Sequence, residues 1–153
     1  MKKYLYFILP VIYIFLDQAT KFLVTKNIPY GSFIKINDCL SIVNVSNTGT
    51  AFSMFQNNNL IFIFIISAII VYLLFFIFKN RTELTNLQMH CLLLILSGGV
   101  GNLTDRIFRG AVVDFIDAGY KEVYRWPSFN VADSCVCIGV FLFIIFCLRK
   151  NND

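Results

Sequence analysis

Charged residues are scarce in this sequence. Only 14% of its 153 residues are Asp, Glu, Lys or Arg, whereas a soluble domain usually carries about 25%. Hydrophobic residues make up 58% of the chain. This composition excludes an ordinary soluble domain and predicts a single integral membrane domain over residues 1–153, with little chain left for a separate soluble part.

Blocks of basic residues are also missing. The formal net charge is +4, but the Lys and Arg residues stand singly or in pairs around apolar runs. We therefore expect no nucleic acid as a partner, and expect anionic lipid headgroups to be the partners of these cations.

Histidine and paired cysteines are scarce as well. The one histidine, His90, lies at the opposite end of its apolar segment from the carboxylates described below, which argues against Ser–His or Cys–His catalysis and against a zinc centre of the usual kind. The five cysteines are odd in number and scattered, mostly in or beside apolar runs where a free thiol behaves as a small hydrophobe. We expect no disulfide or metal framework.

Four apolar segments are long enough to be membrane spans, for which about 20 residues are needed. They cover residues 4–24, 60–78, 87–107 and 131–148. The first follows Met1-Lys2-Lys3 but lacks a small-residue cleavage site, so we expect a span and not a cleaved signal peptide. Residues 31–45 mix apolar and polar side chains at short period, which is typical of short strands, and we expect the surface sheet over residues 31–57. The predicted fold class is an α-helical membrane protein with four transmembrane helices and a small β-sheet and loop on the extracytoplasmic face.

The orientation is predicted from the charges that flank the spans. Six Lys or Arg residues lie on the side of the termini and seven on the other, but those near the termini flank span ends or a very short loop, where the positive-inside rule is strongest. We therefore expect cytoplasmic termini. Among the acidic residues only Glu83 and Asp153 lie with the termini, so any chemistry is expected on the extracytoplasmic side.

Asp114 and Asp133 are the first candidates for catalysis because both stand at the edges of apolar sequence. Two carboxylates brought together at low dielectric do not both ionise easily, so one holds a proton while the other stays charged. That arrangement supplies the general acid and the general base for hydrolysis of a peptide by water. The alternative is that each carboxylate caps a helix end or pairs with Arg106 or Lys21.

Other polar residues could support such a site. Asp17 and Lys21 stand one helical turn apart, either as an intrahelical ion pair that reaches to the membrane surface or as a brace for the site. Asn102, Asp105 and Arg106 share a helix face by their spacing, and Arg106 could hold a carboxylate or a lipid phosphate.

Two further segments have alternative interpretations. Gly98, Gly99 and Gly101 lack the spacing and context of a phosphate-binding loop, so we interpret them as positions of close helix packing. Residues 117–128 form a candidate lid loop.

Taken together, five segments resemble those of the lipoprotein signal peptidase (signal peptidase II) family of bacterial membrane aspartyl peptidases. They are Asp17-Gln18-Ala19-Thr20-Lys21, Asn47-Thr48-Gly49-Thr50-Ala51-Phe52, Gly101-Asn102-Leu103-Thr104-Asp105-Arg106, Val113-Asp114-Phe115-Ile116 and Phe129-Asn130-Val131-Ala132-Asp133. Their order across the four predicted spans also agrees with the family. The departures at Ser97, Gly99 and Thr50 keep small side chains.

The resemblance implies an endopeptidase that removes signal peptides from diacylglyceryl-modified prolipoproteins, cutting on the N-terminal side of the lipidated cysteine. It implies that Asp114 and Asp133 are the catalytic dyad and that no metal or cofactor takes part. The residues it implies for substrate binding and site support are Asp17, Lys21, Asn47, Gly49, Asn102, Arg106 and Asn130. We expect a monomer in the bacterial cell membrane, in contact with membrane lipids.

Two other functions fit the composition. A small proton- or ion-coupled transporter would show sequence symmetry between two halves, and none is found. A non-catalytic subunit for membrane assembly would tolerate the loss of either Asp114 or Asp133.

Overall fold

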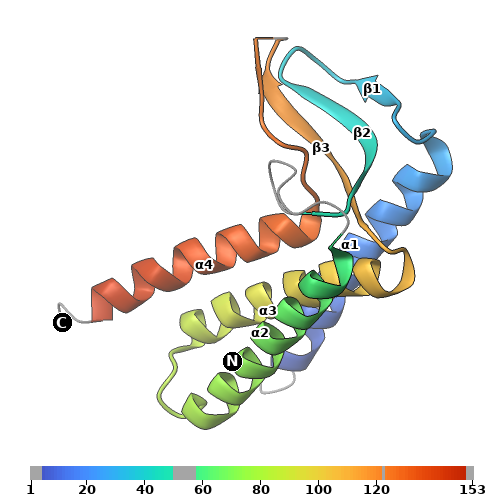
Figure 1. Ribbon diagram of the computed structural model, residues 1–153. Coiled ribbons are helices and arrows are strands. Elements are labelled where there is room, and N and C mark those ends of the chain that lie inside the picture. Colours follow the sequence, from blue (N-terminus) through green and yellow to red (C-terminus); the bar gives the residue numbers. More distant parts are fainter. Residues whose placement is uncertain (1–4, 50–57, 122, 151–153) are drawn as a thin grey trace.

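Four long helices and a small sheet make up the fold (Figure 1). The computed structural model describes residues 5–49, 58–121 and 123–150. The helices are α1 (Leu5–Asn27), α2 (Asn59–Asn80), α3 (Asn86–Phe108) and α4 (Val131–Lys150). Each is long and apolar enough to cross a membrane. The predicted class of four spans with a small sheet is therefore confirmed.

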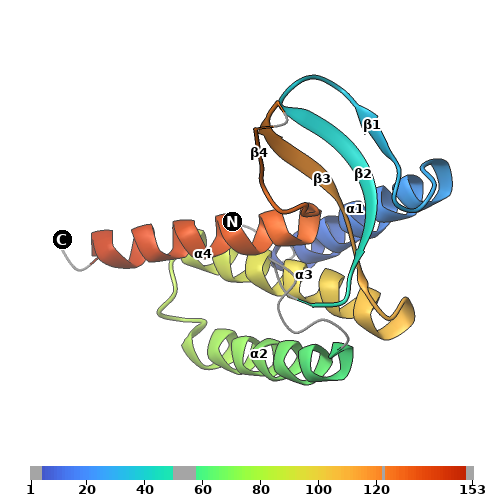
Figure 2. The ribbon, with the colours of Figure 1, turned by 45° about the horizontal axis from the view of Figure 1, so that its top comes forward.

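The two helices in the middle of the chain differ in burial. α3 packs against α1, α2 and α4, and begins with a capping box in which Thr85 and Gln88 bond each other's backbone N–H. α2 packs mainly against α3 and has no buried residue; Figure 2 shows it at the edge of the bundle. A helix that is apolar all round is suited to a lipid environment.

Glycines allow α3 to approach its neighbours closely. A Cβ added at Gly98 would lie 2.3 Å from the carbonyl oxygen of Ala132 on α4, and one added at Gly101 would lie 2.7 Å from Oδ2 of Asp17 on α1. The interpretation of these two glycines as packing positions is therefore confirmed. Gly99 faces Ile70, with 3.5 Å to the nearest atom, which is ordinary contact.

This difference gives a prediction with an internal control. Gly98→Ala should destabilise the fold by about 1–3 kcal/mol, because the new methyl group forces α3 and α4 apart. Gly99→Ala, one position away, should leave the stability unchanged or raise it by up to about 1 kcal/mol, because alanine is the better helix former and meets only ordinary contact there. Thermal unfolding of the two variants in the same detergent measures the difference, and equal melting temperatures would contradict it.

The sheet stands at one end of the helices, away from the first turn of α1 and the last turn of α4 (Figure 1). It is antiparallel with the order β1 (Phe33–Lys35), β2 (Leu40–Asn47), β3 (Val112–Tyr120) and β4 (Tyr124–Arg125). α3 stops where Gly110 takes a φ of 78°, a left-handed conformation that commonly ends helices. β3 then begins at Val112, so the end of α3 and the start of β3 lie next to each other.

The predicted sheet segment, residues 31–57, holds only two of the strands, and residues 50–57 lie outside the described part of the chain. Periodicity near residues 31–45 indicated strands, but did not indicate that β3, far along the chain, pairs with β2. Such pairing is decided by non-local contacts.

The loop predicted at residues 117–128 is wrong for part of its length, because residues 117–120 and 124–125 are strand. Arg125 fastens this hairpin to the sheet. Its Nε donates to Oδ1 of Asp117 at 3.0 Å and its Nη2 to Oδ2 at 2.6 Å, and Nη2 also donates to Oγ of Ser41 on β2 at 3.0 Å. The guanidinium therefore links three strands.

Candidate active site

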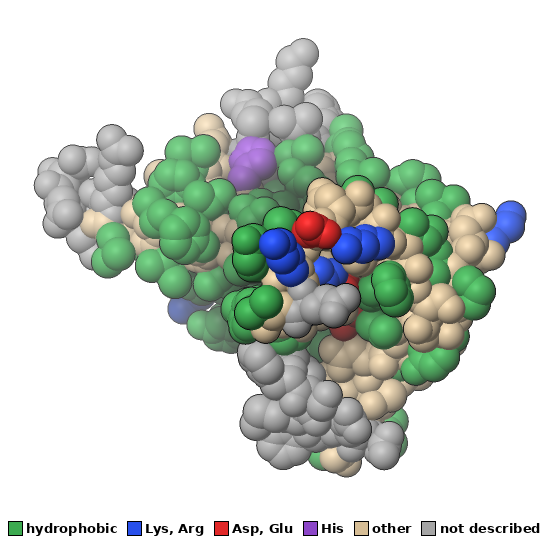
Figure 3. Space-filling view, turned by 90° about the horizontal axis from the view of Figure 1, so that it is seen from above, with side chains coloured by type: hydrophobic (Ala, Val, Ile, Leu, Met, Phe, Trp, Pro, Cys, Tyr) green, Lys and Arg blue, Asp and Glu red, His purple; other side chains and the backbone are tan. Residues whose placement is uncertain are grey.

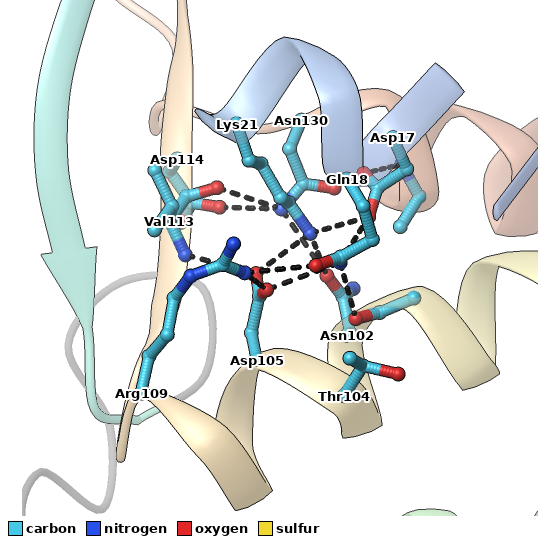
Figure 4. A network of polar contacts seen from close by, with 12 residues as sticks. Asp17, Gln18, Lys21, Asn102, Thr104, Asp105, Arg109, Val113, Asp114 and Asn130 are labelled. Carbon is cyan, nitrogen blue, oxygen red and sulfur yellow. Dashed lines mark hydrogen bonds and ion pairs between the residues drawn. The ribbon is translucent and has the colours of Figure 1, made fainter. Parts of the chain in front are cut away.

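A network of buried polar side chains lies where α1, α3 and α4 meet the sheet (Figure 4). Among the largest fully buried side chains of the described residues are Lys21, Asn130, Asp17 and Asp105. Burying so many polar groups is costly unless each is hydrogen-bonded or paired. We therefore expect each of these groups to have a hydrogen-bond or ion-pair partner.

Lys21 on α1 is the central cation of this network. Its side chain is 0% exposed, and its Nζ lies 2.8 Å from Oδ2 of Asp17 and 2.8 Å from Oδ2 of Asp105. Nζ also donates to Oδ1 of Asn102 at 3.1 Å. Three donors meet three acceptors, so the ammonium is fully satisfied. Lys21 therefore does not reach to the membrane surface, and the structure supports its interpretation as a brace.

Asp17 connects α1 to α4. Its Oδ1 accepts a 2.9 Å hydrogen bond from the backbone N–H of Ala132, in the first turn of α4. That amide has no partner within the helix. The Asp17–Lys21 pair therefore fixes the start of the helix that carries Asp133.

Asp105 is shared by several donors on α1 and at the end of α3. Gln18 donates from Nε2 to Oδ1 of Asp105 at 3.1 Å, and Nη1 of Arg109 pairs with the same oxygen. The backbone N–H of Val113, at the start of β3, donates to Oδ2 at 3.3 Å. Asp105 thus ties the beginning of β3 to α3.

Asn130 joins the two candidate catalytic carboxylates. Its side chain is 0% exposed, and its Nδ2 donates to Oδ1 of Asp114 at 2.7 Å. Its backbone N–H donates to Oδ2 of Asp133 at 3.2 Å, while its Oδ1 accepts from the backbone N–H of Asp133 at 2.9 Å. The reciprocal pair is a capping box at the start of α4. Asp133 therefore caps its helix, which was one alternative to a catalytic role. Only Oδ2 serves the cap, because Oδ1 accepts a hydrogen bond from Nδ2 of Asn102 at 2.7 Å.

Asp114 on β3 is 3% exposed. Besides Asn130, it is held by Nδ2 of Asn47 on β2, which donates to Oδ2 at 3.0 Å. Burial raises the pKa of Asp114 to about 6, and the negative charge of Asp133 contributes in the same direction. Asn130 bonds both Asp114 and Asp133, so one residue positions the two carboxylates.

Arg106, on the last turns of α3, is 6% exposed. Its Nη2 donates to the carbonyl oxygen of Gly49 at 2.7 Å, and its Nη1 to Oδ1 of Asn59 at 3.1 Å. Gly49 in turn donates its N–H to Oδ1 of Asn47 at 3.0 Å. Arg106 therefore forms no ion pair with Asp114 or Asp133, contrary to one alternative, and holds the chain next to Asn47.

The charges of the site nearly balance. Its ionisable side chains are the carboxylates of Asp17, Asp105, Asp114 and Asp133 and the cations of Lys21, Arg106 and Arg109. Four negative and three positive charges leave a formal charge of −1 when all are ionised. One proton shared by Asp114 and Asp133 makes the site neutral, which lowers the cost of burying it.

The structure brings together every residue that the sequence proposed for the site. It adds Gln18, Arg109 and Asn59, which had no assigned role there, and it pairs Asp105, which was expected to share a helix face with Asn102 and Arg106, with Lys21. Gln18 lies inside a quoted segment, so its place in that segment could have indicated it. Nothing in the sequence indicated Asn59. The part of the second segment from Thr50 to Phe52 lies outside the described residues.

Comparison with known families agrees with this geometry. Residues 9–149 match the model of the family described as signal peptidase (SPase) II. The chain is 41% identical over 152 residues to the lipoprotein signal peptidase of Borrelia hermsii, covering 92% of this chain and 88% of that protein. It is 39% identical over 146 residues to the lipoprotein signal peptidase of Clostridium tetani, covering 95% and 93%.

Solved structures agree as well. A bacterial membrane enzyme determined by the in meso method at 2.3 Å resolution superposes with a TM-score of 0.89 at 28% identity, covering 99% of this chain and 92% of that one. A second bacterial membrane enzyme, at 1.9 Å resolution, gives a TM-score of 0.84 at 29% identity, covering 97% and 96%. These likenesses do not favour the transporter alternative. The chain therefore belongs to the signal peptidase II family of membrane proteases.

Proposed function

We propose that Asp114 and Asp133 form the catalytic dyad with which this chain removes signal peptides from prolipoproteins, cutting on the N-terminal side of a cysteine that carries diacylglycerol. The observation that carries this assignment is that Asn130 donates hydrogen bonds to both carboxylates. Its side chain bonds Asp114 and its backbone N–H bonds Asp133. The same residue therefore positions both carboxylates, the buried one of Asp114 and the half-buried one of Asp133.

The chemistry follows from one shared proton. The ionised carboxylate takes a proton from a water molecule, whose oxygen attacks the carbonyl carbon of the scissile amide. The protonated carboxylate then gives its proton to the leaving nitrogen as the C–N bond breaks. Asn47, Asn102 and Asn130 donate hydrogen bonds to the carboxylates, so the acid and the base are oriented before the substrate arrives.

The sheet and the dyad are proposed to lie on the extracytoplasmic side, with the termini in the cytoplasm. Seen from above the sheet, charged side chains gather at the centre of this face among hydrophobic ones (Figure 3). Tyr120, Tyr124 and Trp126 are exposed here, and such rings prefer the level of the lipid headgroups. A lipidated substrate confined to the bilayer would then meet the dyad where water is available.

The test is hydrolysis of a synthetic prolipoprotein segment by the purified chain in detergent. We expect the precursor with diacylglyceryl-cysteine to be cut into a signal peptide and a product that begins with the lipidated cysteine. Mass spectrometry identifies the bond. Cleavage elsewhere, or no cleavage, would contradict the proposed function.

The pH dependence of this reaction has a predicted sign. Because burial, together with the negative charge of Asp133, raises the pKa of Asp114 to about 6, the first proton to bind the doubly ionised dyad binds near that pH. Above that pH the free enzyme loses its acid, so kcat/KM should fall as the pH rises through about 6. Bound substrate excludes water and raises the pKa further, so the fall in kcat should lie at higher pH. A kcat/KM that instead rises through this range would show that the ionised form of Asp114 is required.

A further inference from the structure

The first turn of α2 has a role that none of the site segments indicated. α2 is apolar and has no buried residue, yet its first residue, Asn59, makes two hydrogen bonds to Arg106. Its Oδ1 accepts from Nη1 of Arg106 at 3.1 Å, and its Nδ2 donates to the backbone carbonyl of Arg106 at 2.9 Å. One amide therefore holds both the guanidinium and the main chain of the same residue.

Phe62 completes this contact from the same helix face. It follows Asn59 by three residues, so the two side chains are neighbours on α2. The guanidinium carbon of Arg106 lies 4.6 Å from the centroid of the Phe62 ring, within the range of a cation–π interaction. Asn59 and Phe62 thus hold the guanidinium from α2, and its Nη2 is left to bond Gly49.

Arg106, held in this way, is linked to Asp114 by a short series of hydrogen bonds. Arg106 fixes the carbonyl of Gly49, the N–H of Gly49 fixes Oδ1 of Asn47, and Nδ2 of Asn47 fixes Asp114. Within the described residues, the guanidinium bonds no carboxylate directly. The hydrogen bonds of the guanidinium in the described residues go to neutral groups, and Asn59 is the hydrogen-bond partner on α2.

We propose that Asn59 is a positioning residue for the reaction, which orients the Arg106 guanidinium with the help of the Phe62 ring and so keeps Asn47 in place against Asp114. This role rests on the proposed function, because it acts through the groups that hold the dyad. It also gives α2 a task in the site besides spanning the membrane.

Two substitutions at Asn59 separate orientation of the guanidinium from capping of α3. Asn59→Ala removes both bonds, whereas Asn59→Asp keeps an acceptor for Nη1 and loses the donor to the Arg106 carbonyl. In the precursor cleavage assay, we expect Asn59→Ala to lower kcat roughly tenfold to hundredfold, as misplacement of a reacting group does. KM should change by less than about threefold, because ground-state binding is kept. Asn59→Asp should restore kcat to near the wild-type value.

Matched controls lie at the other end of the same helix. Asn80→Ala removes an amide that, among the described residues, donates to the carbonyl oxygen of Phe76 on α2 itself, and it should leave kcat unchanged. Phe62→Leu should lower kcat severalfold, whereas Phe75→Leu, at a ring that is 62% exposed, should not.

In an Arg106→Lys background, Asn59→Ala should add little, because both changes remove the same interaction.

The proposal is overturned if Asn59→Ala and Phe62→Leu both keep the wild-type kcat, or if Asn59→Asp is as impaired as Asn59→Ala, which would indicate a purely structural cap. Should Asn59→Ala not fold, Asn59→Asp and Phe62→Leu decide the matter. The proposed function is tested separately. It is contradicted if the Asp114→Asn or the Asp133→Asn variant still cleaves the precursor. If both of those are inactive while Asn59→Ala is fully active, only the role of Asn59 fails.

Discussion

Replacing either Asp114 or Asp133 by Asn is expected to abolish cleavage of the lipidated precursor, with a loss of at least about a thousandfold in kcat. Loss of general acid or base catalysis alone typically costs about 10²–10⁴-fold, and here each carboxylate is one half of a pair that must share a proton. Asn has the shape of Asp but cannot carry that proton. The measurement is the rate of product formation at saturating precursor.

The same variants should remain folded. Each carboxylate accepts one hydrogen bond at each oxygen from asparagine groups, and an amide of the same shape keeps the acceptor for one of the two donors. Asp38→Asn is a suitable control, because Asp38 is exposed and its carboxylate, among the described residues, pairs with Lys35, an i,i+3 neighbour, at 2.8 Å. It should retain full activity. Turnover by either dyad variant within tenfold of the control would be incompatible with the dyad.

Lys21→Met is expected to cause the largest loss of stability of any single substitution at the site. Met has a similar length and no charge, so Asp17 and Asp105, which are 1% and 0% exposed, would both lose a cation at 2.8 Å. Removing one partner from a buried ion pair costs about 3–5 kcal/mol. The measurement is thermal and denaturant unfolding in detergent.

Two companions make this result specific to the buried charges. Lys26→Met, on the same helix but near the exposed Phe22 ring, should change the stability by less than about 0.5 kcal/mol. Adding Asp17→Asn to Lys21→Met should recover part of the loss, because Lys21 is the cation that pairs with Asp17 in the described residues, whereas Asp105 keeps Arg109. A Lys21→Met variant as stable as Lys26→Met would show that the site is open to water.

The sequence by itself determined the properties that depend on local composition. Four apolar runs of near-spanning length predict four helices whatever their neighbours are. In lipid each backbone N–H and C=O group must be hydrogen-bonded within its own segment, and a helix does this. The i,i+4 spacing of Asp17 and Lys21 and the capping position of Asp133 are likewise local, so they could be anticipated. The segments around Asp114 and Asn130 marked the site through their likeness to a family.

The tertiary structure decided which of these groups meet. Lys21 bonds Asp105 across 84 residues of chain, and Asn59 bonds Arg106 across 47. Gly110, with a φ of 78°, follows the end of α3, and the next strand, which carries Asp114, pairs with β2 from far earlier in the chain. Such contacts depend on how whole helices pack, which no short pattern encodes. For that reason Asn59, on an otherwise unremarked apolar helix, was found only when the helices were assembled.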